Sequence, residues 1–173
     1  HTQDIQQIFK HTIPVGAKFG IIRVLIGKEN FEVATFRKDG DYQDGRRPVS
    51  IIFCDEKEDA FRRDFTINGL FWNPVSNQII DYVEGQEDIK NKRIKTIGVP
   101  EERFSEDHLR LMRAIRFSAQ LSFDIEEKTW YALLMASLIH TVSSERIREE
   151  LMKMLLCSYP DKAIFLLEQS KLF

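Results

Sequence analysis

Short apolar runs alternate with polar turns through the first half of the chain, which is the pattern of a β-rich segment. Residues 21–26 and 31–36 are rich in Ile, Val and Phe, and the polar linker between them contains Gly27, so they predict a β-hairpin. Residues 37–48 are polar and contain Gly40 and Gly45, so we expect a long loop there. We also expect a short helix over residues 3–9, strands at residues 50–53 and 79–83, and the start of a helix over residues 65–71.

After Gly98 the spacing of apolar residues changes to that of helices. The first helix is expected to begin at Ser105, a good N-cap, with Glu106 and Asp107 in its first turn. An apolar stripe recurs along it at helical spacing, and polar groups fall on another flank. The stripe is Leu109, Met112, Ile115 and Ala119, and the polar flank is Asp107, Arg110 and Arg113. Further helices are expected over residues 127–139, from Ser143 or Ser144, and from Pro160.

This change of pattern predicts an α+β fold in two parts, residues 1–100 and an all-helical part, residues 101–173. Of the 173 residues, 43% are hydrophobic and 13 are Phe, which is enough to bury a real core. The sequence lacks a run of about 18 apolar residues, so a membrane-spanning protein is disfavoured. Cys54 and Cys157 lack the spacing of a metal site or a disulfide framework, so we expect a reducing, cytoplasmic setting.

Asp107 and Arg110 are candidates for base recognition. A carboxylate three residues from a guanidinium offers a hydrogen-bond acceptor beside a fork of donors, which suits the Watson–Crick edge of cytosine or adenine. The alternative is a solvated surface ion pair, the commoner role of such a pair on a helix.

An upstream motif favours base recognition: Arg62-Arg63-Asp64-Phe65-Thr66-Ile67-Asn68. Arg62 and Arg63 could hold triphosphate oxygens through paired hydrogen bonds, and Asp64 could accept one from a ribose 2′-hydroxyl. Taken alone, the motif is explained more simply by a solvated basic pair followed by an N-cap Asp. The net charge of −2 does not by itself indicate a nucleic-acid binder.

In their order and separation, the two motifs resemble those of the class II tRNA nucleotidyltransferases and bacterial poly(A) polymerases of the polymerase-β-like superfamily. The resemblance continues through residues 15–20, 31–37, 44–48 and 144–151. It implies a partial polymerase-β-like nucleotidyltransferase head followed by a helical neck. It also implies nucleotide contacts for Arg63, Asp64 and Asn68, a base-templating pair in Asp107 and Arg110, basic positions near the phosphates or in the neck for Arg113 and Arg116, neck support by Glu145 and Arg146, and a flexible loop containing Arg46 and Arg47. A capped helix with a solvated Glu–Arg pair is an alternative for Glu145 and Arg146.

The resemblance further implies two-metal chemistry with magnesium ions (Mg2+) held by carboxylates. In the family, two carboxylates come from an Asp-x-Asp after a glycine-containing turn, and a third comes from a later strand. We expect the first element to be absent from this chain and the 173 residues alone to be inactive. Glu32 matches the third carboxylate, as a catalytic and metal-binding candidate, although an exposed hairpin Glu explains it equally well. Asp39-Gly40-Asp41 follows a strand and opens a polar loop, so we interpret it as a turn.

The function that the resemblance implies is template-independent addition of CCA, or its terminal A, to tRNA 3′ ends from CTP and ATP. One alternative is a poly(A) polymerase that uses ATP on another RNA 3′ end. In the family this loop is short in enzymes restricted to C, so by resemblance the long loop at residues 37–48 favours a protein able to add A. The alternative from another class is a non-catalytic module that binds RNA or a nucleotide.

Overall fold

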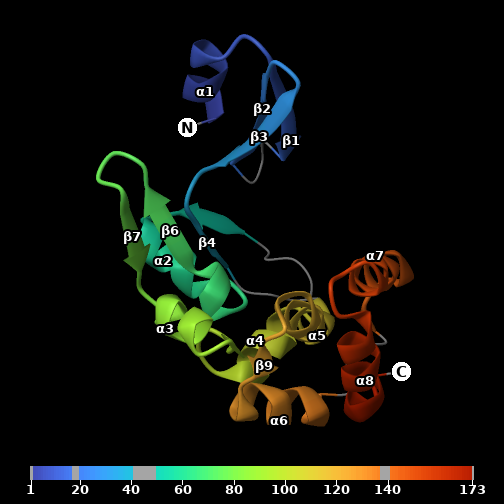
Figure 1. The fold of residues 1–173 in the computed structure, drawn as a ribbon. Coiled ribbons are helices and arrows are strands. Elements are labelled where there is room, and N and C mark those ends of the chain that lie inside the picture. The colour runs from blue at the N-terminus through green and yellow to red at the C-terminus, as the bar shows by residue number, and fades with distance from the viewer. Residues whose placement is uncertain (1, 17–19, 41–49, 137–140, 173) are drawn as a thin grey trace.

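A computed structural model describes residues 2–16, 20–40, 50–136 and 141–172 of the chain. Strands and short helices come first, and longer helices follow (Figure 1). In chain order the elements are α1 (Thr2–Ile8), β1 (Thr12–Gly16), β2 (Ile21–Ile26), β3 (Glu29–Ala34), β4 (Arg37–Asp39), β5 (Ile51–Phe53), α2 (Glu56–Phe61), the 3₁₀-helix η2 (Thr66–Asn68), β6 (Leu70–Asn73), β7 (Gln78–Asp81), α3 (Gly85–Lys90), β8 (Arg93–Ile94), α4 (Pro100–Glu106), α5 (Leu109–Leu121), β9 (Asp124–Ile125), α6 (Glu127–Met135), α7 (Ser144–Leu155) and α8 (Pro160–Ser170).

The predicted hairpin is confirmed and forms part of an antiparallel sheet in which β2 lies between β1 and β3. Ile22 and Val24 of β2 point to the same side, and each is 1% exposed. The loop predicted from residue 37 was wrong at its start, because Arg37–Asp39 pairs with Ile51–Phe53 as β4 and β5. Residues 41–49, which include Arg46 and Arg47 of the predicted flexible loop, lie outside the described residues.

The helix predicted to start at residues 65–71 was wrong. Only one 3₁₀ turn forms, and β6 follows it directly. Phe65 is extended and fully buried, and it forms a β-bridge with Thr96. Its backbone therefore pairs with another segment and does not form the first turn of a helix. Gly69 makes the turn into β6, where a Cβ atom would come within 2.5 Å of the Val83 side chain. Long-range contacts, which local sequence does not reveal, therefore override helix formation here.

The helix predicted to begin at Ser105 is in fact two helices. Pro100 occupies the first position of α4, which suits its fixed φ, and Ser105 lies inside that helix. Asp107 then adopts an extended conformation, and α5 begins at Leu109. The prediction that Asp107 shares a helix flank with Arg110 and Arg113 was therefore wrong. The predicted apolar stripe is confirmed, since Met112, Ile115 and Ala119 are fully buried and Leu109 is 7% exposed.

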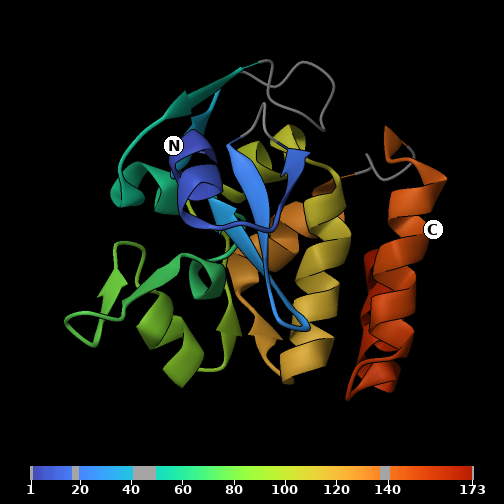
Figure 2. The same cartoon turned by 90° about the horizontal axis from the view of Figure 1, so that it is seen from above.

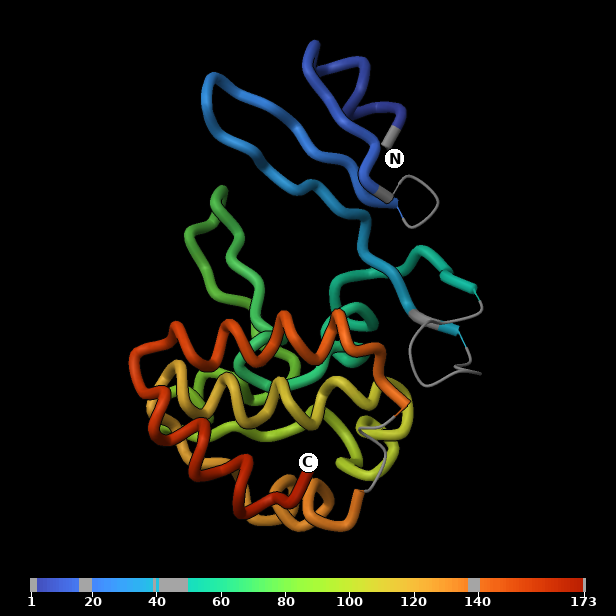
Figure 3. Tube along the Cα trace, turned by 90° about the vertical axis from the view of Figure 1, so that its right-hand side faces the viewer, coloured from blue at the N-terminus to red at the C-terminus, as the bar shows by residue number. Residues whose placement is uncertain are grey.

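Helix α5 lies at the centre of the main core. It packs against α7 and α8, which lie together at one edge of the molecule (Figure 2), and it also contacts α4, β8 and β9. β8 pairs in parallel with β9, and Phe65 and Ile94 belong to the same apolar cluster as α5. The two predicted parts thus share a core, and their division at residue 100 stays a prediction. The β1–β3 sheet lies at the opposite end from α8 (Figure 3). In the part of the chain that is described, no helix is long and apolar enough to cross a membrane.

A buried ion pair fixes α7 on α5. Glu150 of α7 is 2% exposed and accepts hydrogen bonds from Arg116 of α5, at 2.5 Å, and from Lys153, at 2.9 Å. Burial would raise the pKa of Glu150, but hydrogen bonds from Lys153 and Arg116 and their positive charges outweigh it, so the pKa lies below its usual range. Glu150 is therefore ionised and compensates the charge of Arg116, which is itself 7% exposed.

Removing one member of this pair should destabilise the protein strongly. In the complete polypeptide, Glu150→Ala leaves a buried guanidinium without its carboxylate, a change that costs about 3–5 kcal/mol. Urea denaturation should show this as a large loss of unfolding free energy, whereas Glu149→Ala, on the exposed side of the same helix, should change it by no more than about 0.5 kcal/mol. Equal effects of the two substitutions would show that the ion pair does not hold the helices.

Candidate functional site

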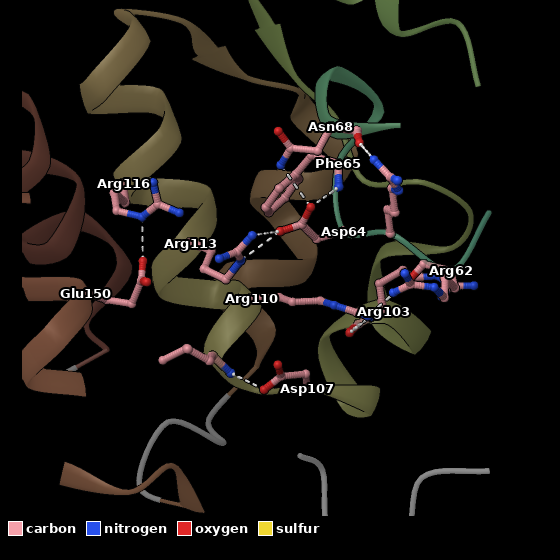
Figure 4. A network of polar contacts seen from close by, with 12 residues as sticks. Arg62, Asp64, Phe65, Asn68, Arg103, Asp107, Arg110, Arg113, Arg116 and Glu150 are labelled. Atoms are coloured by element: carbon pink, nitrogen blue, oxygen red, sulfur yellow. Dashed lines mark hydrogen bonds and ion pairs between the residues drawn. The ribbon is translucent and has the colours of Figure 1, made fainter. Parts of the chain in front are cut away.

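The two sequence motifs meet at an ion pair between Asp64 and Arg113, 49 residues apart in the chain (Figure 4). Oδ2 of Asp64 accepts a hydrogen bond from Nε of Arg113, at 2.7 Å, and lies 2.6 Å from Nη2. Oδ1 accepts hydrogen bonds from the Phe65 backbone N–H and the Asn68 amide, each at 2.9 Å. Asp64 is 8% exposed, so this is a nearly buried polar contact between the η2 segment and α5.

Asp64 is held in its ionised form. Burial alone would raise its pKa, but the positive charge of Arg113 and the hydrogen bonds from Asn68, Arg113 and Phe65 outweigh burial, and the pKa lies below its usual range. A carboxylate has about four acceptor positions, and these donors use all of them. A ribose hydroxyl would therefore have to replace one of the present donors in order to bond to Asp64.

Arg62 and Arg63 share one buried carboxylate, Asp59 of α2, which the sequence reasoning missed. Oδ1 of Asp59 lies 2.7 Å from Nη2 of Arg62, and Oδ2 accepts a hydrogen bond from Nε of Arg63 at 3.0 Å. Nη1 of Arg63 also donates to the Asn68 carbonyl at 2.7 Å, and its guanidinium lies 4.5 Å from the Phe71 ring centre. The Arg63 guanidinium therefore links α2, through Asp59, to η2, through Asn68. An acidic residue three and four positions before two arginines was the available signal.

Asp59 is 2% exposed, yet it is ionised. Its burial would raise the pKa, but the Arg37 backbone N–H, Arg62 and Arg63 outweigh burial, so the pKa is lowered. Arg62 also donates to the Arg37 carbonyl at 2.8 Å, so Asp59 and Arg62 together connect α2 to β4.

Asp107 and Arg110 are close along the backbone, but their side chains point to different neighbours (Figure 4). Nη1 of Arg110 donates to Glu106, at 2.6 Å, and to the Arg103 carbonyl, at 2.9 Å, and Nη2 donates to the Arg62 carbonyl at 3.3 Å. Asp107 instead pairs with Arg146 of α7, at 2.9 Å. Arg110 and Arg113 therefore both face the first motif, and Asp107 faces α7.

Arg116 contacts α7 through Glu150, and its guanidinium lies 3.9 Å from the Phe117 ring centre. This places it in the helical network on α5. Glu145, at the start of α7, is exposed, while its neighbour Arg146 makes the contact to Asp107.

Glu32 lies on β3, exposed, opposite Arg23 of β2. No group of three or more His, Cys, Asp or Glu side chains that could hold a metal ion occurs among the residues described. A single exposed carboxylate does not fit a site for two divalent ions, so we assign no metal to this arrangement. Asp41, Arg46 and Arg47 are outside the described residues.

Known proteins resemble both parts of the chain. Residues 1–95 match the family model of the poly A polymerase head domain, and residues 122–173 match that of the probable RNA and SrmB-binding site of polymerase A. A CCA-adding enzyme of Staphylococcus aureus (strain MRSA252) is 48% identical over 155 residues, which cover 88% of this chain and 38% of that protein. The chain thus spans about two-fifths of the length of such relatives.

Solved structures of CCA-adding enzymes share the fold. That of Bacillus stearothermophilus in complex with CTP matches with a TM-score of 0.88 and 36% identity over 98% of this chain and 41% of that one. That of Thermotoga maritima complexed with tRNA matches with a TM-score of 0.78 and 27% identity over 99% of this chain and 39% of that one. The chain therefore belongs to the poly A polymerase head-domain family, as the resemblance of its motifs indicates.

The ionised state of Asp64 predicts how stability depends on pH. Because its pKa is lowered on folding, its contribution is present above the unfolded pKa of about 3.9 and is lost as the pH falls through the folded value. Asp64→Asn in the complete polypeptide should lower the melting temperature at pH 7, and the difference from wild type should shrink towards pH 3. Asp161→Asn, at an exposed position, is the control. A difference that stays constant from pH 7 to pH 3 would contradict this account of Asp64.

Proposed function

From this family membership, we propose that the chain is the nucleotide-binding part of a template-independent tRNA nucleotidyltransferase that adds CCA, or its terminal A, from CTP and ATP. The observation that carries the proposal is the Asp64–Arg113 junction, which brings the first motif onto the helix that begins beside Asp107. The CCA-adding relatives, with structures that contain CTP and tRNA, support these substrates.

Base selection follows from the chemistry of Asp107 and Arg110. Cytosine and adenine both present an amino group beside a ring nitrogen that accepts a hydrogen bond. A carboxylate can accept from the amino group while a guanidinium donates to the ring nitrogen. Uracil and guanine present a carbonyl beside a ring N–H, which reverses both roles and leaves polar groups unpaired. One acceptor and one donor from the protein are therefore sufficient to select C and A without a nucleic-acid template.

Arg110 can serve this role through Nη2. Its Nη1 is engaged twice, with Glu106 and the Arg103 carbonyl, and these contacts fix the plane of the guanidinium. Among the described residues, Nη2 makes only a long bond of 3.3 Å to the Arg62 carbonyl, which a base nitrogen can replace at little cost.

We place the ribose and phosphates of the incoming nucleotide near the first motif, residues 62–68. We propose that Asp64 accepts a ribose hydroxyl in place of one Arg113 contact, which releases guanidinium donors for a phosphate. Asn68 orients Asp64, and Arg62 and Arg63 supply positive charge that Asp59 only partly cancels. Magnesium remains an expectation from the resemblance, and among the described residues Glu32 alone does not complete a site for it. The cytoplasm is the proposed location.

A poly(A) polymerase is the second candidate, because both matching family models describe that enzyme. The complete polypeptide should be assayed on a tRNA that lacks its 3′ CCA and on one that ends in CC, with CTP and ATP singly and together. The proposal predicts addition of A that ends after one residue, or of C and C followed by A. Long tracts of A from ATP alone would favour the poly(A) polymerase, and no incorporation at all would favour a non-catalytic nucleotide-binding module.

Substitution of the templating residues should relax base choice without unfolding the protein. Asp107→Ala and Arg110→Ala each remove a contact that discriminates bases by roughly 1–3 kcal/mol, so selection of CTP and ATP over GTP and UTP should fall about tenfold or more. The measurement is incorporation of each of the four nucleotides by the complete polypeptide, with a thermal melt of each variant and Glu149→Ala as control. Unchanged nucleotide preference in both folded variants would refute the template assignment.

A further inference from the structure

The direction of the Asp107 side chain is set mainly by a contact from α7. Asp107 is extended between α4 and α5, with φ −144° and ψ 104°, and the start of α5 contributes one long hydrogen bond to its carboxylate, from the Leu109 backbone N–H at 3.2 Å. Its side chain is 18% exposed, so packing encloses it only in part. The carboxylate is held by two contacts from one atom, Nη2 of Arg146 on α7, at 2.9 Å to Oδ2 and 3.1 Å to Oδ1.

These contacts orient Asp107 and still leave room for a ligand. A carboxylate has about four acceptor positions. Among the described residues, Arg146 uses two of them and the Leu109 backbone N–H uses a third, at 3.2 Å. One further donor, such as the amino group of a base, can therefore bond to Asp107 while Arg146 stays in place.

The position of Arg146 is itself well defined. Glu150 lies one turn after it on α7 and pairs with Arg116. Along α7 the positive Arg146 therefore precedes the negative Glu150, whereas their partners, Asp107 and Arg116, follow in the opposite order of charge. The reversed order of charges fixes the register of α7 along α5, because sliding by one turn would bring like charges together.

If Arg146 only held α7 on the core, its substitution would lower the stability of the protein and leave base choice unchanged. The buried Arg116–Glu150 pair and the fully buried Met154 hold α7 on the core. The Asp107–Arg146 pair is only partly buried, at 18% and 21% exposed, so its loss should cost less stability than loss of the buried pair. Its loss should leave α7 in place and change mainly the freedom of the Asp107 carboxylate.

We propose that Arg146 is a specificity-determining positioning residue, which holds the Asp107 carboxylate towards the amino group of the incoming cytosine or adenine. This inference rests on the proposed function, since it assigns to Arg146 an effect on base choice through Asp107. Without Arg146 the carboxylate rotates, and the carbonyl oxygens of uracil and guanine no longer meet a fixed negative charge.

The test compares variants of the complete polypeptide by the ratio of kcat/KM for CTP to that for UTP. Arg146→Gln should lower this ratio about tenfold, as expected when a charge-assisted hydrogen bond that orients the reading group is lost. Arg146→Lys should restore most of it, because a single nitrogen makes both contacts and an ammonium can replace it. Arg148→Gln, at an exposed position on the same helix, is the matched control and should match wild type. Thermal melts establish that each variant is folded.

A double variant separates this inference from the proposed function. If Arg146 acts through Asp107, then Asp107→Ala with Arg146→Gln should discriminate no worse than Asp107→Ala alone. If Asp107→Ala leaves base choice unchanged, the proposed function fails. If Asp107→Ala relaxes base choice but folded Arg146→Gln keeps the wild-type ratio, only the role of Arg146 is overturned. Should Arg146→Gln not fold, Arg146→Met, which keeps the aliphatic stem and its packing, takes its place with the same expected outcomes.

Discussion

The nearly buried ion pair between Asp64 and Arg113 is the contact on which the arrangement of the site depends. It joins a short segment of the α+β part to the central helix, and it sets the rotation of α5 about its axis. Arg110, one turn earlier on the same face, then reaches the carbonyl of Arg62. Buried ion pairs contribute little net stability when both members are counted, but losing one member is costly. Such a pair therefore specifies one packing of α5 on the first motif more than it adds stability.

Helix α5 serves three neighbours with three sets of residues. Its apolar stripe fills the main core, Arg110 and Arg113 face the first motif, and Arg116 faces α7. Asp107, just before the helix, is tied to α7 through Arg146. A change in the position of α7 would therefore reach the predicted base-reading carboxylate directly, whereas the first motif is tied to α5 through Arg110 and Arg113.

Features with local causes could be predicted from the sequence. The hairpin around Gly27 and the buried stripe of α5 follow from residue spacing, and the start of α8 follows from the fixed φ of Pro160. Features with distant causes could not. Phe65 is extended because it pairs with Thr96, 31 residues away by chain numbering. Asp59 of α2 also accepts a hydrogen bond from the Arg37 backbone N–H of β4, a contact that only the folded structure shows. The contact between Asp107 and Arg146 spans 39 residues, so no local spacing indicates it.

A structure of the complete polypeptide with CTP bound tests the central claim most directly, which is that side chains of this chain read the base. The account predicts that the cytosine amino group lies within hydrogen-bond distance of the Asp107 carboxylate, about 2.7–3.2 Å, and that Arg110 donates to the ring nitrogen. Arg146 should keep its contact to Asp107 in that complex. A cytosine bound away from these side chains, with Asp107 and Arg110 retaining only their present partners, would contradict the account.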